Sequence, residues 1–501
     1  MNKVIKLFAI VAIMASSLAL EAQNFDFSAS CESGQTLYYK ITGANEVEIT
    51  YPNTDLFPYL GPQMPVGNVT IPSMVTFEGH EYEVTAIGEK GFKGCNTMMG
   101  ELVIPNSVKK IGQAAFKDCT GLIGSLAVPN SVSSIGAGAF EGCVGMTGTL
   151  SLPASLSYFG HLAFSTCWES FVIDEDSPYF FVDSNCIIMK SDSTLVLGCK
   201  NSVIPDYVKA IGYGAFYKCS ELNGELFLPD CLEEVGTYAF KNCYRLSGDL
   251  VVPDHVKKIG TYAFSMCYGF NSMTLGKSVQ EIQAFAFADT HNFQYIVSKN
   301  PIAPPSAQAF DGVGDVPVIV PCGALENYQN AVEWKDFSSI EERNLFEIEA
   351  VSANEEHGSV EIYQMPDDCL DNTAAVLAVP RENHSFINWT EDGVVVSEDS
   401  LFFFPLESDR HLVANFQYSN IGESQSSLIN VFPNPTKGLL NINAENVEMI
   451  CVFDVNGLQV SEMKAISEKN CVLDLTSLPS GCYAVQIVGK HGAITRIVVK
   501  D

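Results

Sequence analysis

The chain has 501 residues, 47% of them hydrophobic and 17% charged, which is too apolar for a disordered protein. Its length leaves room for about three domains at roughly 150 residues each. The formal net charge of −31, with no basic cluster longer than Lys109-Lys110 or Lys257-Lys258, disfavours nucleic acid and anionic membranes as partners.

Residues 1–22 have the features of an export signal. Lys3 and Lys6 precede an apolar run from Leu7 to Leu20. The run is shorter than the ~20 residues that a membrane span needs, and no later apolar segment is longer. We therefore expect export across the inner membrane to the cell surface or the medium. The mature chain is expected to begin near Gln23 and to contain no integral membrane segment.

Residues 23–83 alternate apolar and polar side chains in several stretches, which is typical of strands. A regular repeat follows directly after this segment. We expect residues 23–83 to form an N-terminal cap that covers the first coil of the repeat structure.

The segment from residue 84 to residue 294 repeats one pattern about every 24 residues. Each unit reads L-x-(I/V/L)-P-x-x-(V/L)-x-x-(I/V/F)-G-x-x-A-F-x-x-C, and a short strand is predicted before the proline, which cannot donate to a ladder. One unit cannot bury its apolar face alone, so the units are predicted to stack as coils of a solenoid. One phenylalanine per unit is predicted to lie on the next in a continuous core: Phe92, Phe116, Phe140, Phe164, Phe216, Phe240, Phe264 and Phe287.

An irregular insert interrupts the repeat at residues 168–202, where two successive repeat prolines are 52 residues apart. A hairpin centred on Asp192-Ser193 is predicted inside it. Residues 295–344 are predicted to form the C-terminal cap of the solenoid, ending in a short helix. The side chains predicted to cover the last coil are Tyr328, Trp334 and Phe337.

Sixteen cysteines in an exported chain would ordinarily indicate a disulfide framework. Here the side chains at one repeat position are predicted to point in parallel into the core, which favours buried free thiols over disulfides between neighbouring coils. Cys186 and Cys199 are predicted to lie opposite each other on the hairpin, where a cross-strand disulfide stays open. The cysteines that share the repeat position are Cys95, Cys119, Cys143, Cys167, Cys219, Cys243 and Cys267.

The repeat units resemble the BspA-like family of leucine-rich repeats over residues 84–294. The matching pattern is L-x-I-P followed by V-x-x-I-G-x-x-A-F-x-x-C-x-x-L. The resemblance implies a leucine-rich-repeat solenoid in an exported or surface-displayed bacterial protein. Several members of that family are associated with adhesion to host proteins or to other cells.

A small all-β domain is expected after the solenoid, at residues 345–417. Its strand-like alternation resembles a bacterial repeat found in surface proteins, with an F-x-x-W-x-x-x-G signature at Phe386, Trp389 and Gly393. Residues 418–428 are polar and Ser-rich and are predicted to be a linker.

Residues 429–501 are predicted to form a C-terminal β-sandwich, so the fold class expected for the whole chain is mainly β. This segment resembles the type A C-terminal sorting domain of the type IX secretion system. The resemblance implies a delivery tag recognised at the outer membrane, with the type IX machinery as a partner. The matching residues are Phe432-Pro433-Asn434-Pro435, Gly438, Asp454, Gly457, Leu473, Leu475, Gly481-Cys482-Tyr483, Arg496 and Lys500.

The sequence gives no indication of catalysis. The eight histidines never fall at metal-ligand spacing with Cys, Asp or Glu, and no G-x-S-x-G, P-loop, G-x-G-x-x-G or EF-hand pattern occurs. We expect a protein that is not an enzyme, with no catalytic residue, no metal and no cofactor. A hydrolase with an unrecognised site is the remote alternative.

Aromatic residues recur at two further repeat positions, and stacking of the coils would align them in rows. Exposed aromatic rows are candidate contact surfaces for an extracellular protein or glycan, although they could instead cover the edge of the core. We therefore predict a binding or adhesion protein, with a structural surface or biofilm component as the alternative. The candidate binding residues are Trp168, Tyr238, Tyr244, Tyr262, Tyr268 and Phe285.

Overall fold

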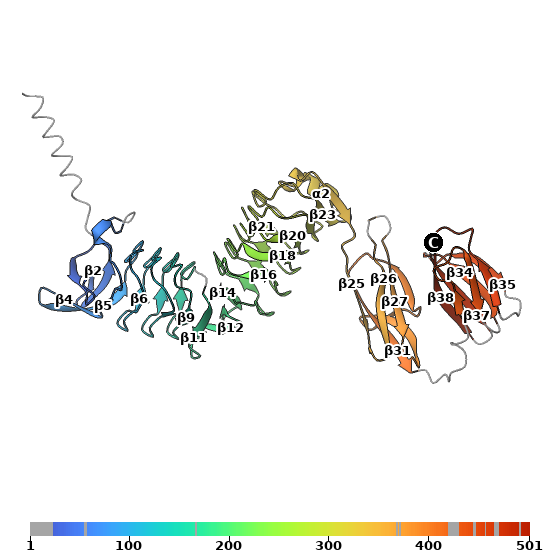
Figure 1. Ribbon diagram of the computed structural model, residues 1–501, viewed down its shortest axis with the longest axis horizontal. Helices are drawn as coiled ribbons and strands as arrows, with labels where there is room; N and C mark the ends of the chain where they lie inside the picture. The colour runs from blue at the N-terminus through green and yellow to red at the C-terminus, as the bar shows by residue number, and fades with distance from the viewer. Residues whose placement is uncertain are drawn as a thin grey trace, which may run out of the picture. The chain divides into compact units, whose positions relative to one another are not determined.

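The structure is a computed structural model that divides into two compact units, residues 1–342 and 343–501 (Figure 1). The signal segment at residues 1–22 and nearly all of the linker at residues 418–428 lie outside the described residues. The structure describes residues 24–54, 58–165, 168–366, 369, 372–418, 430–443, 447–455, 457–464, 470–489 and 492–501.

The first unit begins with a twisted sheet that leads directly into the solenoid. β2 pairs antiparallel with β1 and with β3, β5 runs parallel to β3, and β4 pairs with β5. The far edge of β5 then pairs with the first strand of the coils, so the cap supplies the first rung of the ladder. Its strands are β1 (Phe27–Ser30), β2 (Thr36–Gly43), β3 (Glu46–Thr50), β4 (Met74–Phe77) and β5 (His80–Ile87), with the 3-10 turn η1 (Gly61–Gln63) before β4.

The described residues between 86 and 343 form a solenoid of about 11 turns. One side of each regular coil carries a strand of two residues just before the repeat glycine, and these strands pair in parallel from coil to coil. The repeat pattern did not predict this strand. The strands are β6 (Lys110–Ile111), β8 (Ser134–Ile135), β10 (Tyr158–Phe159), β15 (Ala210–Ile211), β17 (Glu234–Val235), β19 (Lys258–Ile259) and β21 (Glu281–Ile282).

A second set of parallel strands confirms in part the strand that the sequence predicts before the repeat proline. Strands precede Pro129, Pro153 and Pro253. The described residues directly before Pro105, Pro205 and Pro229 are not in a strand. β9 and β18 end at the residue before Pro153 and Pro253, where the missing N–H stops the ladder. This set comprises β7 (Leu126–Ala127), β9 (Thr149–Leu152), β11 (Ser170–Ile173), β16 (Asn223–Glu225), β18 (Arg245–Val252), β20 (Phe270–Leu275), β22 (Ile296–Ser298), β23 (Val318–Pro321) and β24 (Ile340–Arg343).

The repeat glycine is needed because adjacent coils approach each other closely there. A Cβ placed on Gly112 would lie 2.6 Å from the backbone nitrogen of Glu89 in the preceding coil. Cβ atoms on Gly136 and Gly260 would also overlap the backbone of the coil before them. A side chain at this position would therefore push two rungs of the ladder apart.

The core phenylalanines stack face to face, but in two separate series. Ring centroids lie 5.1–5.6 Å apart from Phe92 through Phe164 and 5.0–5.7 Å apart from Phe216 through Phe310. Among the described residues no ring contact joins Phe164 to Phe216, so the prediction of one continuous stack is wrong. The buried side chains likewise form two clusters in this unit.

The insert explains the interruption. Its strands are β12 (Phe180–Asp183), β13 (Cys186–Met189) and β14 (Thr194–Gly198). β14 pairs in parallel with β15 and takes the ladder position of a missing coil, while its other edge pairs antiparallel with β13 rather than with β10. Gly198 donates its N–H to the Ala215 carbonyl, as the core phenylalanine does in other coils, and a Cβ there would overlap the ring of Phe216.

The repeat cysteines are buried thiols that form no disulfide wherever the structure describes them, and Cys167 lies outside the described residues. Cys143 and Cys267 donate S–H hydrogen bonds of 3.1 Å to the carbonyls of Phe116 and Phe240 in the preceding coil. Burial raises the pKa of both thiols to about 12. The thiol thus satisfies a buried carbonyl while filling space in the core.

Cys186 and Cys199 are also buried and form no disulfide, and they are not cross-strand partners. Cys186 lies opposite Gly198, because the hairpin register shifts at a bulge between Ile187 and Ile188. The predicted hairpin itself is confirmed by the antiparallel pairing of β13 and β14.

The end of the solenoid is covered by aromatic side chains, as predicted. Tyr328 lies on α2 (Leu325–Asn330) and Trp334 on the 3-10 turn η2 (Trp334–Asp336), and both are fully buried. Trp334 and Phe337 contact Phe310, the last ring of the stack, with centroids 4.9 and 5.6 Å away. The open face of the final coil is therefore shielded from water.

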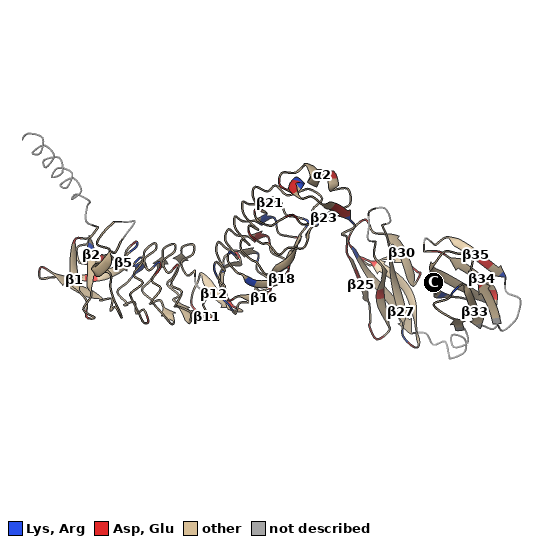
Figure 2. Cartoon of the chain, turned by 45° about the horizontal axis from the view of Figure 1, so that its top comes forward, with Lys and Arg blue, Asp and Glu red and all other residues tan. Residues whose placement is uncertain are grey.

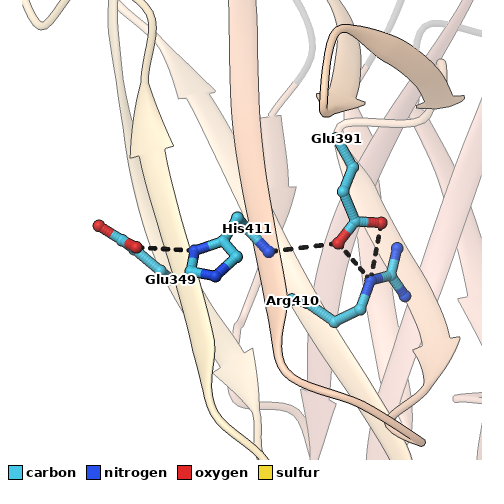
Figure 3. A network of polar contacts seen from close by, with 4 residues as sticks. All are labelled: Glu349, Glu391, Arg410 and His411. Atoms are coloured by element: carbon cyan, nitrogen blue, oxygen red, sulfur yellow. Dashed lines mark hydrogen bonds and ion pairs between the residues drawn. The ribbon is translucent and has the colours of Figure 1, made fainter. Parts of the chain in front are cut away.

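The second unit begins with a domain of two sheets, β25-β31-β28-β29 and β26-β27-β30, around a core that includes Trp389. Glu391 accepts hydrogen bonds of 2.7 and 2.9 Å from Nε of Arg410, and one from the His411 backbone N–H (Figure 3). The strands are β25 (Ile348–Ser352), β26 (Gly358–Gln364), β27 (Thr373–Pro380), β28 (His384–Glu391), β29 (Val394–Ser397), β30 (Leu401–Pro405) and β31 (Arg410–Tyr418).

The C-terminal domain also has two sheets, β32-β33-β36 and β35-β34-β37-β38, around its own core. Asn434 of the F-P-N-P motif ties the start of the domain to the last strand: its Nδ2 donates to the Ile497 carbonyl and its Oδ1 accepts from the Val499 N–H, both at 2.8 Å. The strands are β32 (Asn430–Phe432), β33 (Leu439–Asn443), β34 (Val447–Phe453), β35 (Gln459–Lys464), β36 (Asn470–Asp474), β37 (Gly481–Gly489) and β38 (Gly492–Lys500).

Candidate functional site: the aromatic rows of the solenoid

The first aromatic row stands at a backbone position that favours glycine. Tyr238, Tyr262 and Phe285 each lie two residues before a core phenylalanine and have φ of 55–60°. Gly138 and Gly214 occupy the same position in other coils, with φ of 60° and 62°. Bulky side chains are uncommon at positive φ, so aromatic residues here carry a backbone cost that glycine avoids.

Hydrogen bonds between coils hold this backbone in place. The N–H of Tyr238 donates to the Thr261 carbonyl at 2.9 Å, and the N–H of Tyr262 donates to the Ala284 carbonyl at 3.1 Å. Because the neighbouring regular coils repeat these bonds, the side chains at this position are aligned along this part of the solenoid.

The three rings form a stack at the surface, which we call the first row. Centroids of Tyr238 and Tyr262 are 5.4 Å apart and those of Tyr262 and Phe285 are 4.9 Å apart, with ring planes within 15° of parallel. Tyr213 continues the row with its ring edge-on to that of Tyr238, and the two ring centroids are 5.5 Å apart. The ring centroid of His161 lies 4.3 Å from that of Tyr213. The rings of the first row are half-buried.

A lysine lies over the first row. Nζ of Lys241 is 3.7 Å from the ring centroid of Tyr262 and 5.2 Å from that of Tyr238, which is a cation–π arrangement. Burial lowers the pKa of Lys241. The row thus combines aromatic surface, tyrosine hydroxyls and one partly desolvated cation.

The second row is more exposed than the first, and one of its predicted members is replaced by another residue. Tyr244 and Tyr268 are 46% and 36% exposed, with centroids 6.1 Å apart, and His291 continues the row 5.7 Å beyond Tyr268. Trp168 does not belong to it, because its side chain is fully buried and its indole N–H donates to the Phe164 carbonyl at 3.1 Å. Trp168 opens the insert and packs into the first core cluster instead.

Tyr213, His291 and Lys241 were not among the residues that the sequence predicted for the rows. Tyr213 lies three residues before its core phenylalanine, one position away from the others, and reaches the row through an edge-on contact. His291 shares the repeat position of Tyr244 and Tyr268, so its place in the second row could have been read from the sequence. Lys241 directly follows a core phenylalanine, but the repeat pattern does not predict that its side chain lies over the rings of the first row.

The described residues contain no group of three or more His, Cys, Asp or Glu side chains that could hold a metal ion. In the same part of the chain, no helix has the length and apolarity needed to cross a bilayer. Figure 2 shows Lys and Arg as separate short segments along the ribbon, in keeping with the acidic composition.

Several solved structures of bacterial repeat proteins resemble the chain. A leucine-rich repeat protein from Bacteroides ovatus shares 20% identity with a TM-score of 0.42, covering 66% of this chain and 82% of that one. The pneumococcal vaccine antigen PcpA shares 17% identity with a TM-score of 0.43, covering 64% and 100%. A leucine-rich cell surface protein from Faecalibacterium prausnitzii shares 19% identity with a TM-score of 0.39, covering 63% and 98%. Among curated proteins, none matches the chain.

Two protein families match defined parts of the sequence. Residues 81–183 and 196–314 match the BspA type leucine rich repeat region in six copies, and the gap between the two ranges falls within the insert. Residues 430–501 match the secretion system C-terminal sorting domain. The chain therefore contains a region of BspA-type leucine-rich repeats and a type IX C-terminal sorting domain.

Proposed function

We propose that this protein is exported and then binds an extracellular protein, without catalysis, through the first aromatic row. The supporting observation is the presence of Tyr238, Tyr262 and Phe285 at a left-handed backbone position. Glycine would fit this position at lower cost, so the aromatic side chains have a use that outweighs the strain. Contact with a partner is such a use, because tyrosine is enriched where binding energy is concentrated.

The arrangement of the rings favours a protein over a glycan as the ligand. Sugars pack on the faces of aromatic rings, but in the first row most faces are covered by the neighbouring rings of the row. What remains for a ligand is a strip of ring edges and tyrosine hydroxyls beside the Lys241 ammonium. Such a strip suits the mixed apolar and hydrogen-bonding surface of a protein.

The export route forms part of the same proposal. A signal at residues 1–22 would take the chain across the inner membrane, and the sorting domain would engage the type IX machinery at the outer membrane. The proposal also includes the domain limits expected from the sequence. These are the caps at residues 23–83 and 295–344, the domain at residues 345–417 and the linker at residues 418–428.

The binding proposal is tested with protein and glycan arrays probed by the purified chain. The test variant replaces Tyr238, Tyr262 and Phe285 together by glycine, the residue found at this position in other coils. We expect saturable binding to one or more proteins and at least a tenfold loss in the variant. The matched control replaces Tyr244 and Tyr268 of the second row by serine and should keep most of the binding.

Circular dichroism and thermal unfolding establish that both variants are folded. Unchanged protein binding by the folded glycine variant would exclude the first row as the contact surface. Binding to glycans alone would contradict the choice of a protein ligand. Self-association without any saturable ligand would instead favour a structural component of the cell surface or biofilm.

A further inference from the structure

In one coil of the solenoid, the backbone groups that would pair with the following coil have no pairing partner among the described residues. Every regular coil offers the next one two carbonyls and two amides. In the coil that carries β8, the carbonyls of Ser133 and Ile135 and the N–H groups of Gly138 and Phe140 are all bonded to the following coil at 2.8–3.1 Å.

The equivalent groups of the coil that carries β10 have no such partner. These are the carbonyls of Ser157 and Phe159 and the N–H groups of Leu162 and Phe164, and none of them has a hydrogen bond within the described part of the chain. The cause is the insert, because β14 pairs with β13 instead of with β10. We call this set of four groups the open edge.

An apolar cavity of about 310 Å³ lies beside the open edge. Its walls combine side chains of the β10 coil, among them Phe159 and Phe164, with Phe180, Met189 and Leu197 of the insert. At the open edge, Phe159 of β10 is only half-buried, whereas Ile111 and Ile135 at the same position of β6 and β8 are fully buried. The cavity therefore adjoins both an accessible strand edge and an apolar interior.

We propose that the open edge and its cavity bind an extended peptide segment of a partner protein, which adds to β10 as a parallel strand. An unpaired strand edge is a template for another chain, and unsatisfied backbone groups beside apolar walls are costly without one. The occupant is a peptide because the same four groups bind peptide backbone in every regular coil. A purely apolar ligand would leave all four unpaired.

The chain also indicates what the peptide should look like. Residues 132–142, VSSIGAGAFEG, lie on the equivalent edge of the coil that carries β6. There the N–H groups of Ser133 and Gly136 donate to the carbonyls of Lys109 and Ile111, at 3.0 and 2.8 Å. A ligand of the open edge should likewise present two N–H donors three residues apart. It should have glycine where its backbone comes close to that of the β10 coil, and small apolar side chains elsewhere.

The proposal is tested with the full chain and a synthetic peptide of sequence VSSIGAGAFEG, acetylated and amidated at its ends. A second peptide carries N-methyl groups on the residues corresponding to Ser133 and Gly136, which removes the two donors but adds apolar surface. Calorimetry should show saturable binding of the first peptide and at least tenfold weaker binding of the second. A scrambled peptide should not bind.

Hydrogen exchange gives an independent readout of the site. On addition of the first peptide, the amides of Leu162 and Phe164 should become protected at least tenfold, while those of Gly236 and Gly260 in regular coils should not change. A Val196→Trp variant, which fills the cavity, should bind the peptide at least tenfold more weakly. Phe227→Ala, at an exposed side chain far along the sequence, should bind it normally.

Several results would overturn the proposal. They are the absence of saturable binding, equal binding of the N-methylated or scrambled peptide, and protection elsewhere than at the open edge. Dimerisation of the chain that the peptide reverses would assign the edge to a second copy rather than to a partner. The proposed function involves the first aromatic row, so loss of array binding in the glycine variant tests that proposal separately.

Discussion

At the residue scale, each repeat position performs one physical task in the regular coils. The glycine allows two backbones to approach, the phenylalanine stacks on its equivalent, and the cysteine donates to a buried carbonyl of the coil before it. These tasks are independent of ligand binding. They explain why the same residue types recur at these positions. By contrast, the left-handed position two residues before the phenylalanine varies, with Lys90, Ala114, Gly138, Leu162 and Tyr238 in successive or later coils.

Replacement of a stacked phenylalanine should be costly. Phe240 is fully buried between two rings at 5.0 and 5.3 Å, so Phe240→Ala should lower the free energy of unfolding by about 3–5 kcal/mol. The control is Phe227→Ala, at a side chain that is 76% exposed, with an expected change within about 0.5 kcal/mol. Urea unfolding followed by circular dichroism measures both, and equal losses would contradict the stacked core.

At the element scale, polar contacts link strands that the apolar core alone would leave free to slide. In the two-sheet domain around Trp389, Glu391 at the end of β28 is bonded to Arg410 and His411 on β31. Hydrogen bonds from Arg410 lower the pKa of Glu391. His411 also bonds Glu349 on β25 at 2.8 Å, so neighbouring strands of one sheet are connected.

Removal of the Glu391 charge should destabilise this sheet in a pH-dependent way. Because the folded pKa of Glu391 is below its ordinary value of 4.5, its contribution is present above that value and is lost as pH falls through the lowered pKa. Glu391→Gln should therefore reduce the amide protection of β28 and β31 by about 1–3 kcal/mol at pH 7, and by much less at pH 3.

Hydrogen exchange read by mass spectrometry measures this difference after correction for intrinsic rates. Glu349→Gln is the matched control, because the Glu349 side chain is 67% exposed and exposed pairs contribute little, about 0–1 kcal/mol. A loss for Glu391→Gln that is the same at both pH values would show that the ion pair is not its cause.

At the scale of the whole molecule, delivery and folding are assigned to different parts of the chain. The buried core of the sorting domain consists of residues between 440 and 498, while the solenoid cores end at residue 337. The buried cores of the solenoid therefore contain no residue of the segment 430–501. The family match of this segment assigns it to secretion.

We expect the chain without residues 430–501 to keep the unfolding transition of the solenoid but to remain inside the cell envelope. Fractionation of cells that express the tagged full chain or the truncated chain measures delivery, and thermal unfolding of the purified proteins measures folding. Delivery of the truncated chain to the surface or medium would contradict the sorting role. Loss of the solenoid transition would show that the parts depend on each other for stability.

The period of the sequence by itself determined the coil, the buried phenylalanines and the buried thiols, because the same contacts recur in each unit. The aromatic cover at Trp334 was predicted from the side chains that follow the last repeat, and the sorting domain from the resemblance of its motif residues to a known family. Only the tertiary structure decided that the phenylalanine stack breaks, that Trp168 is buried and that β10 has an open edge. These features depend on how the insert pairs with itself and on Gly198 replacing a ring, and spacing within a repeat carries no information about pairing across an interruption.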